Sequence, residues 1–120
     1  MKNFYFTLFL LLLLPFNATQ AKEVNELLEN HGRMYEPGHE EPYTGKYVIY
    51  YENGQKRYEG NFVTGKMEGK QIKWHENGQK SYEANYEKGK EHGIVTSWDR
   101  EGNITKTEIL EHGKVIKEIK

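Results

Sequence analysis

Hydrophobic and polar residues follow two different patterns along the 120-residue chain. Residues 4–16 are almost wholly apolar, whereas from residue 43 onward short segments alternate between hydrophobic and polar side chains. A period of two is typical of strands that bury one face. Glycine-containing turns separate the segments at a spacing of about 12 residues, which favours an antiparallel meander. We expect strands at residues 45–51, 55–63, 69–75, 79–87, 93–99, 103–111 and 114–119.

The meander repeats itself with a period of 24 residues. Residues 43–66, 67–90 and 91–114 align without a gap, and both glycines and a bulky aromatic residue recur in fixed registers. We expect the glycines to hold turns, with Asn-Gly at 53–54 and 77–78 forming type I′ hairpins. The aromatic series should supply the core. The structural repeat positions are Gly54, Gly78, Gly102, Gly65, Gly89, Gly113, Tyr50, Trp74 and Trp98.

The alternation also predicts which side chains share a face. In the first block we place Val48 and Tyr50 on the buried face, together with Tyr58, Gly60 and Phe62 of the second strand. The small residue at position 60 should let a neighbouring ring lie across the backbone. The opposite face should be solvated and should carry Arg57, Glu59, Gln71, Lys73, His75, Ser81 and Glu83.

Apolar residues also occur on that nominally solvated face of the first block. Tyr47, Ile49 and Tyr51 stand where the later blocks carry mainly polar side chains. A group of apolar residues on an exposed face is typical of an interaction surface. We therefore predict a partner-binding site at Tyr47, Ile49, Tyr51 and Arg57. The alternative is packing against the N-terminal segment through its apolar residues, which are Val24, Leu27 and Leu28.

Both ends of the chain differ from the repeats. Residues 1–21 have the layout of a signal peptide with cleavage after Ala21, an uncleaved anchor being the alternative. Residues 22–42 form a lead-in, in which we expect a short helix at 23–30 and a short strand at 33–36. The last strand, within the unit 43–120, is charged, which discourages edge-to-edge association. The leader and the absence of cysteine predict an exported bacterial protein, periplasmic or extracellular.

Composition narrows the function. After residue 21 only 16 residues are Leu, Ile, Val or Phe, so the predicted sheet is thin and depends on aromatics. A net charge of -1 gives no electrostatic case for nucleic acid. Ser97, His75 and Asp99 have the residue types of a catalytic triad. We place Ser97 and Asp99 on an open, solvated face, where nothing would exclude water or shift a pKa, so we do not expect them to act as one. The chain lacks cysteine, and its scattered histidines do not suggest zinc. We expect no enzyme activity, cofactor or metal.

The repeat resembles a known family. Residues 58–69 read YEGNFVTGKMEG and residues 82–93 read YEANYEKGKEHG, similar to the Tyr-x-Gly, Gly-Lys and Gly pattern of MORN repeats. The inserted Asn-Gly-Gln turn and the lead-in at 35–46 resemble the variant repeat of small bacterial proteins, including antitoxin-like proteins of the YwqK type. The resemblance implies an all-β protein, an elongated antiparallel meander of stacked hairpins used for partner binding.

These observations converge on one expectation for the function. We expect an exported, non-enzymatic scaffold that binds a macromolecular partner, most simply a protein, through one face of its sheet. Two alternatives remain open at this stage. One is an antitoxin-like neutraliser of a toxin protein, and the other is a module that binds cell-envelope glycan through its aromatic residues.

Overall fold

A computed structural model describes residues 22–119; the predicted leader therefore lies outside the described residues. The described part is all-β and contains no helix. All seven strands predicted from the repeats are present, within a few residues of their expected ends. The strands are β1 (Glu23–Val24), β2 (Leu28–Asn30), β3 (Arg33–Tyr35), β4 (Gly45–Tyr50), β5 (Lys56–Val63), β6 (Lys66–Met67), β7 (Gly69–Trp74), β8 (Lys80–Glu87), β9 (Lys90–Trp98), β10 (Ile104–Glu111) and β11 (Lys114–Ile119).

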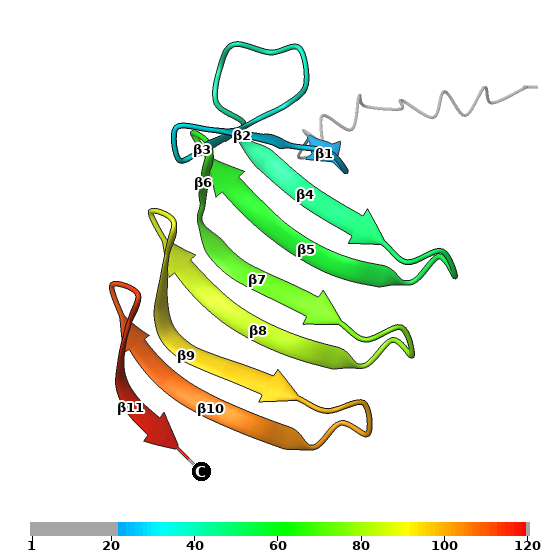
Figure 1. Cartoon of the computed structure of the whole chain (residues 1–120), viewed down its shortest axis with the longest axis vertical. Helices are drawn as coiled ribbons and strands as arrows, with labels where there is room; N and C mark the ends of the chain where they lie inside the picture. Colours follow the sequence, from blue (N-terminus) through cyan, green and yellow to red (C-terminus); the bar gives the residue numbers. More distant parts are fainter. Residues whose placement is uncertain (1–21, 120) are drawn as a thin grey trace, which may run out of the picture.

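One twisted sheet contains most of the chain (Figure 1). Its strands are hydrogen-bonded in the order β1-β4-β5-β7-β8-β9-β10-β11, with β6 beside β5. Every pairing in this sheet is antiparallel except that of β1 with β4. The predicted meander is thus confirmed, and each strand contacts mainly its neighbours in sequence.

The N-terminal segment differs from the prediction. Residues 23–30, expected to be helical, instead contribute β1 and β2. Backbone bonding explains the difference, because Lys46 donates its N–H to the carbonyl of Lys22 at 2.8 Å, and β1 continues along the edge of β4. The spacing of three apolar residues is too short a signal to outweigh an open sheet edge. The short strand expected at 33–36 is present as β3.

Two kinds of turn lie at the two ends of the strands (Figure 1). The Asn-Gly loops are not type I′ turns, because only their glycines, such as Gly54 at +83°, have positive φ. Gly54 N–H bonds to Tyr51 O, and Gln55 N–H bonds to the Asn53 side chain, giving a type I turn with a glycine bulge. Consecutive positive φ angles occur instead in the turns at the other ends of the strands, at residues 64–65, 88–89 and 112–113. The turn at 31–32, which joins β2 and β3, has the same conformation.

The pairing of faces also differs from the prediction by one residue. Gly60 and Tyr58 lie opposite Tyr47 and Ile49, not opposite Val48 and Tyr50. The register shifts between Ile49 and Tyr50, and the extra residue in β5 is Arg57. Because side chains alternate with a period of two, a single bulged residue exchanges the faces of everything beyond it. Equivalent shifts recur in the later hairpins.

The buried residues are consequently not the expected aromatic ladder. Tyr50 is 49% exposed, and Trp74 and Trp98 are only partly buried. The buried set instead consists of Tyr43, Val48, Phe62, Ala84, Val95, Leu110 and the polar residue Gln71. Ala84, Val95 and Leu110 form one cluster, against which Tyr82 and Tyr86 pack. Val48 is buried on the face that it shares with its partner Glu59, whereas Phe62, Gln71 and the Ala84 cluster form a thin core on the other side of the sheet.

Candidate functional site

One face of the sheet carries most of the tyrosines, and we call it the tyrosine face. It includes Tyr47 and Ile49 on β4 and their partners Gly60 and Tyr58 on β5. It continues through Gln71 and Lys73 on β7 to Ala84 and Tyr82 on β8. The Tyr47 ring lies 5.6 Å from that of Tyr58 and 6.1 Å from that of Phe62, centroid to centroid. These contacts fix the rings as a half-buried layer rather than as free side chains.

An open cavity of about 490 Å³ lies on the tyrosine face, and we call it the groove. Strands β4, β5, β7 and β8 contribute to it, and Met34 reaches it from β3. Its apolar and aromatic lining residues are Met34, Tyr47, Ile49, Tyr51, Tyr58, Phe62, Met67 and Trp74, and its polar ones are Arg57, Lys73 and Ser81. Its volume is within the range of small ligand pockets.

The four residues proposed from sequence as a binding site come together in this cavity. Tyr47, Ile49, Tyr51 and Arg57 all line it. The N-terminal segment only partly takes the place of a partner, since Val24 pairs with Tyr47 at the sheet edge while Leu28 is 53% exposed. The repeat pattern does not place Phe62, Lys73 and the two methionines at this site, because their position depends on the bulge and on the path of the lead-in.

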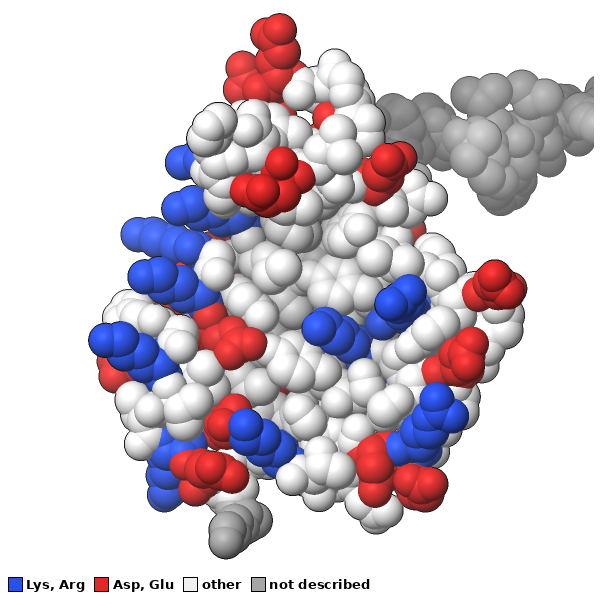
Figure 2. All heavy atoms as spheres, in the orientation of Figure 1, with Lys and Arg blue, Asp and Glu red and all other residues white. Residues whose placement is uncertain are grey.

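Two cations stand in the groove without acidic neighbours. The Arg57 guanidinium lies 5.7 Å from the centroid of the Tyr51 ring, and the Lys73 ammonium lies 5.1 Å from that of Tyr82. Such positions over aromatic faces are weakly attractive. No aspartate or glutamate lines the cavity. Figure 2 views this face, where basic side chains lie near the middle of an otherwise uncharged, hollowed surface.

A buried polar pair forms the floor beside these cations. Gln71 is 1% exposed; it accepts a hydrogen bond from the Tyr58 hydroxyl and donates one to Asn61 O at 3.3 Å. The Gln71 amide and the Tyr58 hydroxyl lie where a Cβ at Gly60 would be, so the small residue leaves room for this polar pair and not for an aromatic ring across the backbone. Burial raises the pKa of the Tyr58 hydroxyl well above its ordinary value, so the group stays protonated and donating.

Successive repeats are tied together by side chains at equivalent positions. The Tyr51 hydroxyl donates to Trp74 O at 2.6 Å, and His75 Nε2 lies 3.0 Å from Trp98 O one repeat later. Asn53 and Asn77 likewise donate to carbonyls of the next hairpin, at 2.9 and 2.8 Å. These bonds hold neighbouring hairpins in register and so preserve the shape of the groove.

Two of the three residues considered as a catalytic triad make hydrogen bonds of this kind. Asp99 accepts hydrogen bonds from the backbone of Glu101 and Asn103, at 3.0 and 2.9 Å. The bonds from Asn103 and the backbone lower the pKa of the Asp99 carboxyl. His75 is engaged with a carbonyl, as described above. Within this arrangement the carboxylate of Asp99 organises its own turn.

The opposite face carries ion pairs between lysine and glutamate side chains. In the first repeat Glu59 pairs with Lys46 at 2.5 Å and with Lys56 at 3.3 Å. In the second, Glu83 pairs with Lys80 at 3.0 Å and with Lys70 at 3.9 Å. The hydrogen bond from Lys46 lowers the pKa of the Glu59 carboxyl. The two faces of the same strands therefore present different chemistry.

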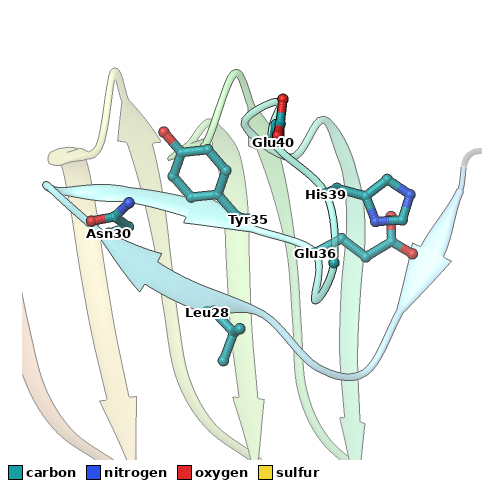
Figure 3. Close-up of a pocket in the computed structure, with 7 residues that line it drawn as sticks. Leu28, Asn30, Tyr35, Glu36, His39 and Glu40 are labelled. Atoms are coloured by element: carbon teal, nitrogen blue, oxygen red, sulfur yellow. The ribbon is translucent and has the colours of Figure 1, made fainter.

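A second cavity, of about 420 Å³, lies in the lead-in (Figure 3). It is lined by residues of β2, β3 and the following loop, including Leu28, Tyr35, Glu36 and His39. In Figure 3 the Leu28 and Tyr35 side chains point in different directions. Glu36 is already ion-paired with Lys22, and its carbonyl accepts the His39 N–H at 3.0 Å. We attribute this cavity to the path of the chain through β2, β3 and the loop that leads to β4, and not to a binding site.

Residues 22–119 contain neither a metal-binding cluster nor a membrane-spanning helix. His92 and His112 lie 5.8 Å apart between ring centroids, but no group of three or more potential ligands that could hold a metal ion occurs in this part of the chain. None of the described segments is a helix long and apolar enough to cross a bilayer.

Comparison with known proteins agrees with the repeat analysis. The family described as "MORN repeat variant" matches residues 43–63 and 67–88. These two segments of the chain are similar to MORN-variant repeats. No curated protein and no solved structure matched it. MORN repeats are often modules that bind proteins or membranes. The groove lies within the two matched repeats, apart from Met34 of the lead-in.

Proposed function

We propose that this protein is an exported, non-enzymatic MORN-variant scaffold that binds a protein partner through the groove on its tyrosine face. The observation that carries the proposal is the single open cavity shared by Tyr47, Ile49, Tyr51 and Arg57. Aromatic rings with half-buried bodies and an accessible edge, together with arginine, are enriched at protein interfaces. Export is proposed from the apolar leader alone.

The rigidity of the groove supports a binding role. Its walls are strands β4, β5, β7 and β8, which antiparallel ladders join to one another, and its floor is fixed by the Tyr58–Gln71 hydrogen bond. A preformed surface loses little conformational entropy on association, so its contacts contribute more fully to affinity. The ion-paired opposite face offers no comparable apolar cavity among those described, which favours the tyrosine face as the interface.

Site-specific photo-crosslinking tests the proposal directly. A benzophenone amino acid would replace Tyr51, which lines the groove, in the full chain expressed in the producing cell. The matched control places the same amino acid at Tyr50, the preceding residue, whose side chain lies on the opposite face and is 49% exposed. We expect one protein adduct from position 51 and none of the same mass from position 50.

Other outcomes would point elsewhere. Equal crosslinking from both positions would contradict the choice of face. Retention of the protein on purified envelope glycan, abolished by Tyr51→Ser but not by Tyr50→Ser, would replace the protein partner with a glycan. If the adduct contained a toxin, whose activity the purified chain then blocked, the antitoxin-like function would follow instead.

A further inference from the structure

The groove is chemically different at its two ends. One end is formed by Met34, Phe62 and Met67 and is apolar. The other end carries Arg57, Lys73 and Ser81. Lys73 lies directly opposite Tyr58, the residue after Arg57, so the two cations are neighbours across β5 and β7. Phe62 follows Tyr58 by four positions on β5, a length of about 13 Å at about 3.3 Å per residue.

The two cations lack the partners that other lysines of the sheet have. On the opposite face Lys46 and Lys56 share Glu59, and Lys70 and Lys80 share Glu83. Among residues 22–119 neither Arg57 nor Lys73 takes part in any ion pair. Two uncompensated positive charges beside an apolar cavity form a surface that is complementary to a negative group attached to an apolar body.

We propose that the partner presents an extended peptide segment with an acidic side chain at one position and apolar side chains two and four residues away. The inference rests on the proposed function and specifies its ligand. Alternate side chains of an extended peptide point the same way, so the side chain two residues away lies over the middle of the groove, at about 7 Å, and the one four residues away reaches the apolar end, at about 13 Å. The carboxylate meets the fork of Arg57 and the ammonium of Lys73.

A peptide fits these observations better than an anionic lipid surface. The cations lie within a cavity of limited width, between aromatic rings, rather than on a broad basic surface. The whole chain has a formal net charge of -1, which provides no long-range attraction to an anionic membrane. The cavity is also open to solvent on this face (Figure 2), so a peptide can enter it from outside.

Selection from a displayed library of random octapeptides tests the inference with the full chain as bait. We expect the selected sequences to share an acidic residue with apolar residues two and four positions away. One selected peptide, and its counterpart with Gln in place of the acidic residue, would then be titrated by fluorescence anisotropy. The loss of a charge-assisted contact should weaken binding about tenfold or more.

Variants assign the effect to the groove. Arg57→Gln and Lys73→Gln should each weaken the acidic peptide about tenfold while changing the affinity of its Gln counterpart little. Lys56→Gln is the matched control, because Lys56 adjoins Arg57 in sequence but pairs with Glu59 on the opposite face. It should bind the acidic peptide like the unmodified chain.

The outcomes separate this inference from the proposed function. Selected peptides that crosslink at position 51 but show no acidic preference would overturn the inference and leave groove binding intact. Failure to select any peptide, or equal affinity of Arg57→Gln for the acidic peptide, would also count against it. Binding to phosphatidylglycerol vesicles, lost in Arg57→Gln, would make a lipid headgroup the ligand and would overturn both proposals.

Discussion

The first two repeats and the third share a backbone but differ in what they display. On the ion-paired face, Lys70, Glu83 and Lys80 of the second repeat correspond to Ile94, Thr107 and Ile104 of the third. The two isoleucines are 58% and 64% exposed. The first repeat has the same Lys-Glu-Lys set as the second.

On the tyrosine face, by contrast, a charged residue of the third repeat replaces an aromatic one. The position of Tyr58 and Tyr82 is occupied by Lys106 in the third repeat, where it pairs with Glu108 at 2.6 Å. The groove therefore ends before the third repeat, which is also the block outside the family match. The comparison shows that turns and ladders fix the backbone, whereas the chemistry of each face varies from repeat to repeat. Terminal repeats are commonly atypical in this way.

The largest expected effect tests whether Phe62 is the packing centre of the first repeat. Phe62 is 3% exposed and contacts the rings of Tyr43 and Tyr47. Phe62→Ala should lower the free energy of unfolding by about 3–5 kcal/mol in urea titration. Val63→Ala, which changes the next residue on the other face at 49% exposure, should change it by less than about 0.5 kcal/mol. Similar losses from both variants would refute the assignment of faces.

A second prediction converts a first-repeat pair into its second-repeat equivalent. Gly60→Ala places a methyl group where Gln71 and Tyr58 lie, and should cost about 1–3 kcal/mol. The corresponding residues of the second repeat are Ala84 and Val95, which pack together. Gly60→Ala combined with Gln71→Val should therefore recover part of the loss. A double variant less stable than Gly60→Ala alone would contradict this equivalence.

A smaller effect is expected at the tight turns. Thr64, Lys88 and His112 all have φ near +50°, a conformation that is least favourable for the β-branched threonine. Thr64→Asn should raise the free energy of unfolding by up to about 1 kcal/mol, measured as a higher melting temperature. Lys88→Asn should raise it less. If the second substitution stabilised more, strain at Thr64 would not be the reason.

The smallest effect concerns pH. The folded-state pKa of Glu59 is lowered chiefly by its hydrogen bond from Lys46. Its contribution to stability is therefore present above the unfolded-state pKa and is lost as the pH falls through the folded-state value. Glu59→Gln should flatten the acid limb of the unfolding curve below about pH 5. Repeating the titration in 1 M NaCl should reduce the difference between the two proteins; an unchanged difference would exclude an electrostatic origin.

The repeat pattern predicted the strands well because both strong signals are local. Period-two alternation and recurring glycines placed all seven repeat strands near their observed ends. The same signals placed Tyr47, Ile49 and Tyr51 on one face, and they do share a cavity. The helix at 23–30 was wrong because Glu23 and Val24 pair with the edge of β4 and Leu28–Asn30 pairs with β3. Both partners lie outside the segment, so its own residues do not encode these contacts.

The sequence by itself determined the number of repeats, the strand order and the alternation within each strand. Only the tertiary structure decided which alternating set is buried, because that choice depends on the bulge at Arg57, a single residue in the hairpin. The bulge puts Tyr58 and Phe62 beside Tyr47, leaves Tyr50 exposed, and brings Arg57 and Lys73 into the groove. Alternation within one strand does not tell which of its two sets of side chains shares a face with a given set on the next strand. Only the pairing of the two strands decides this.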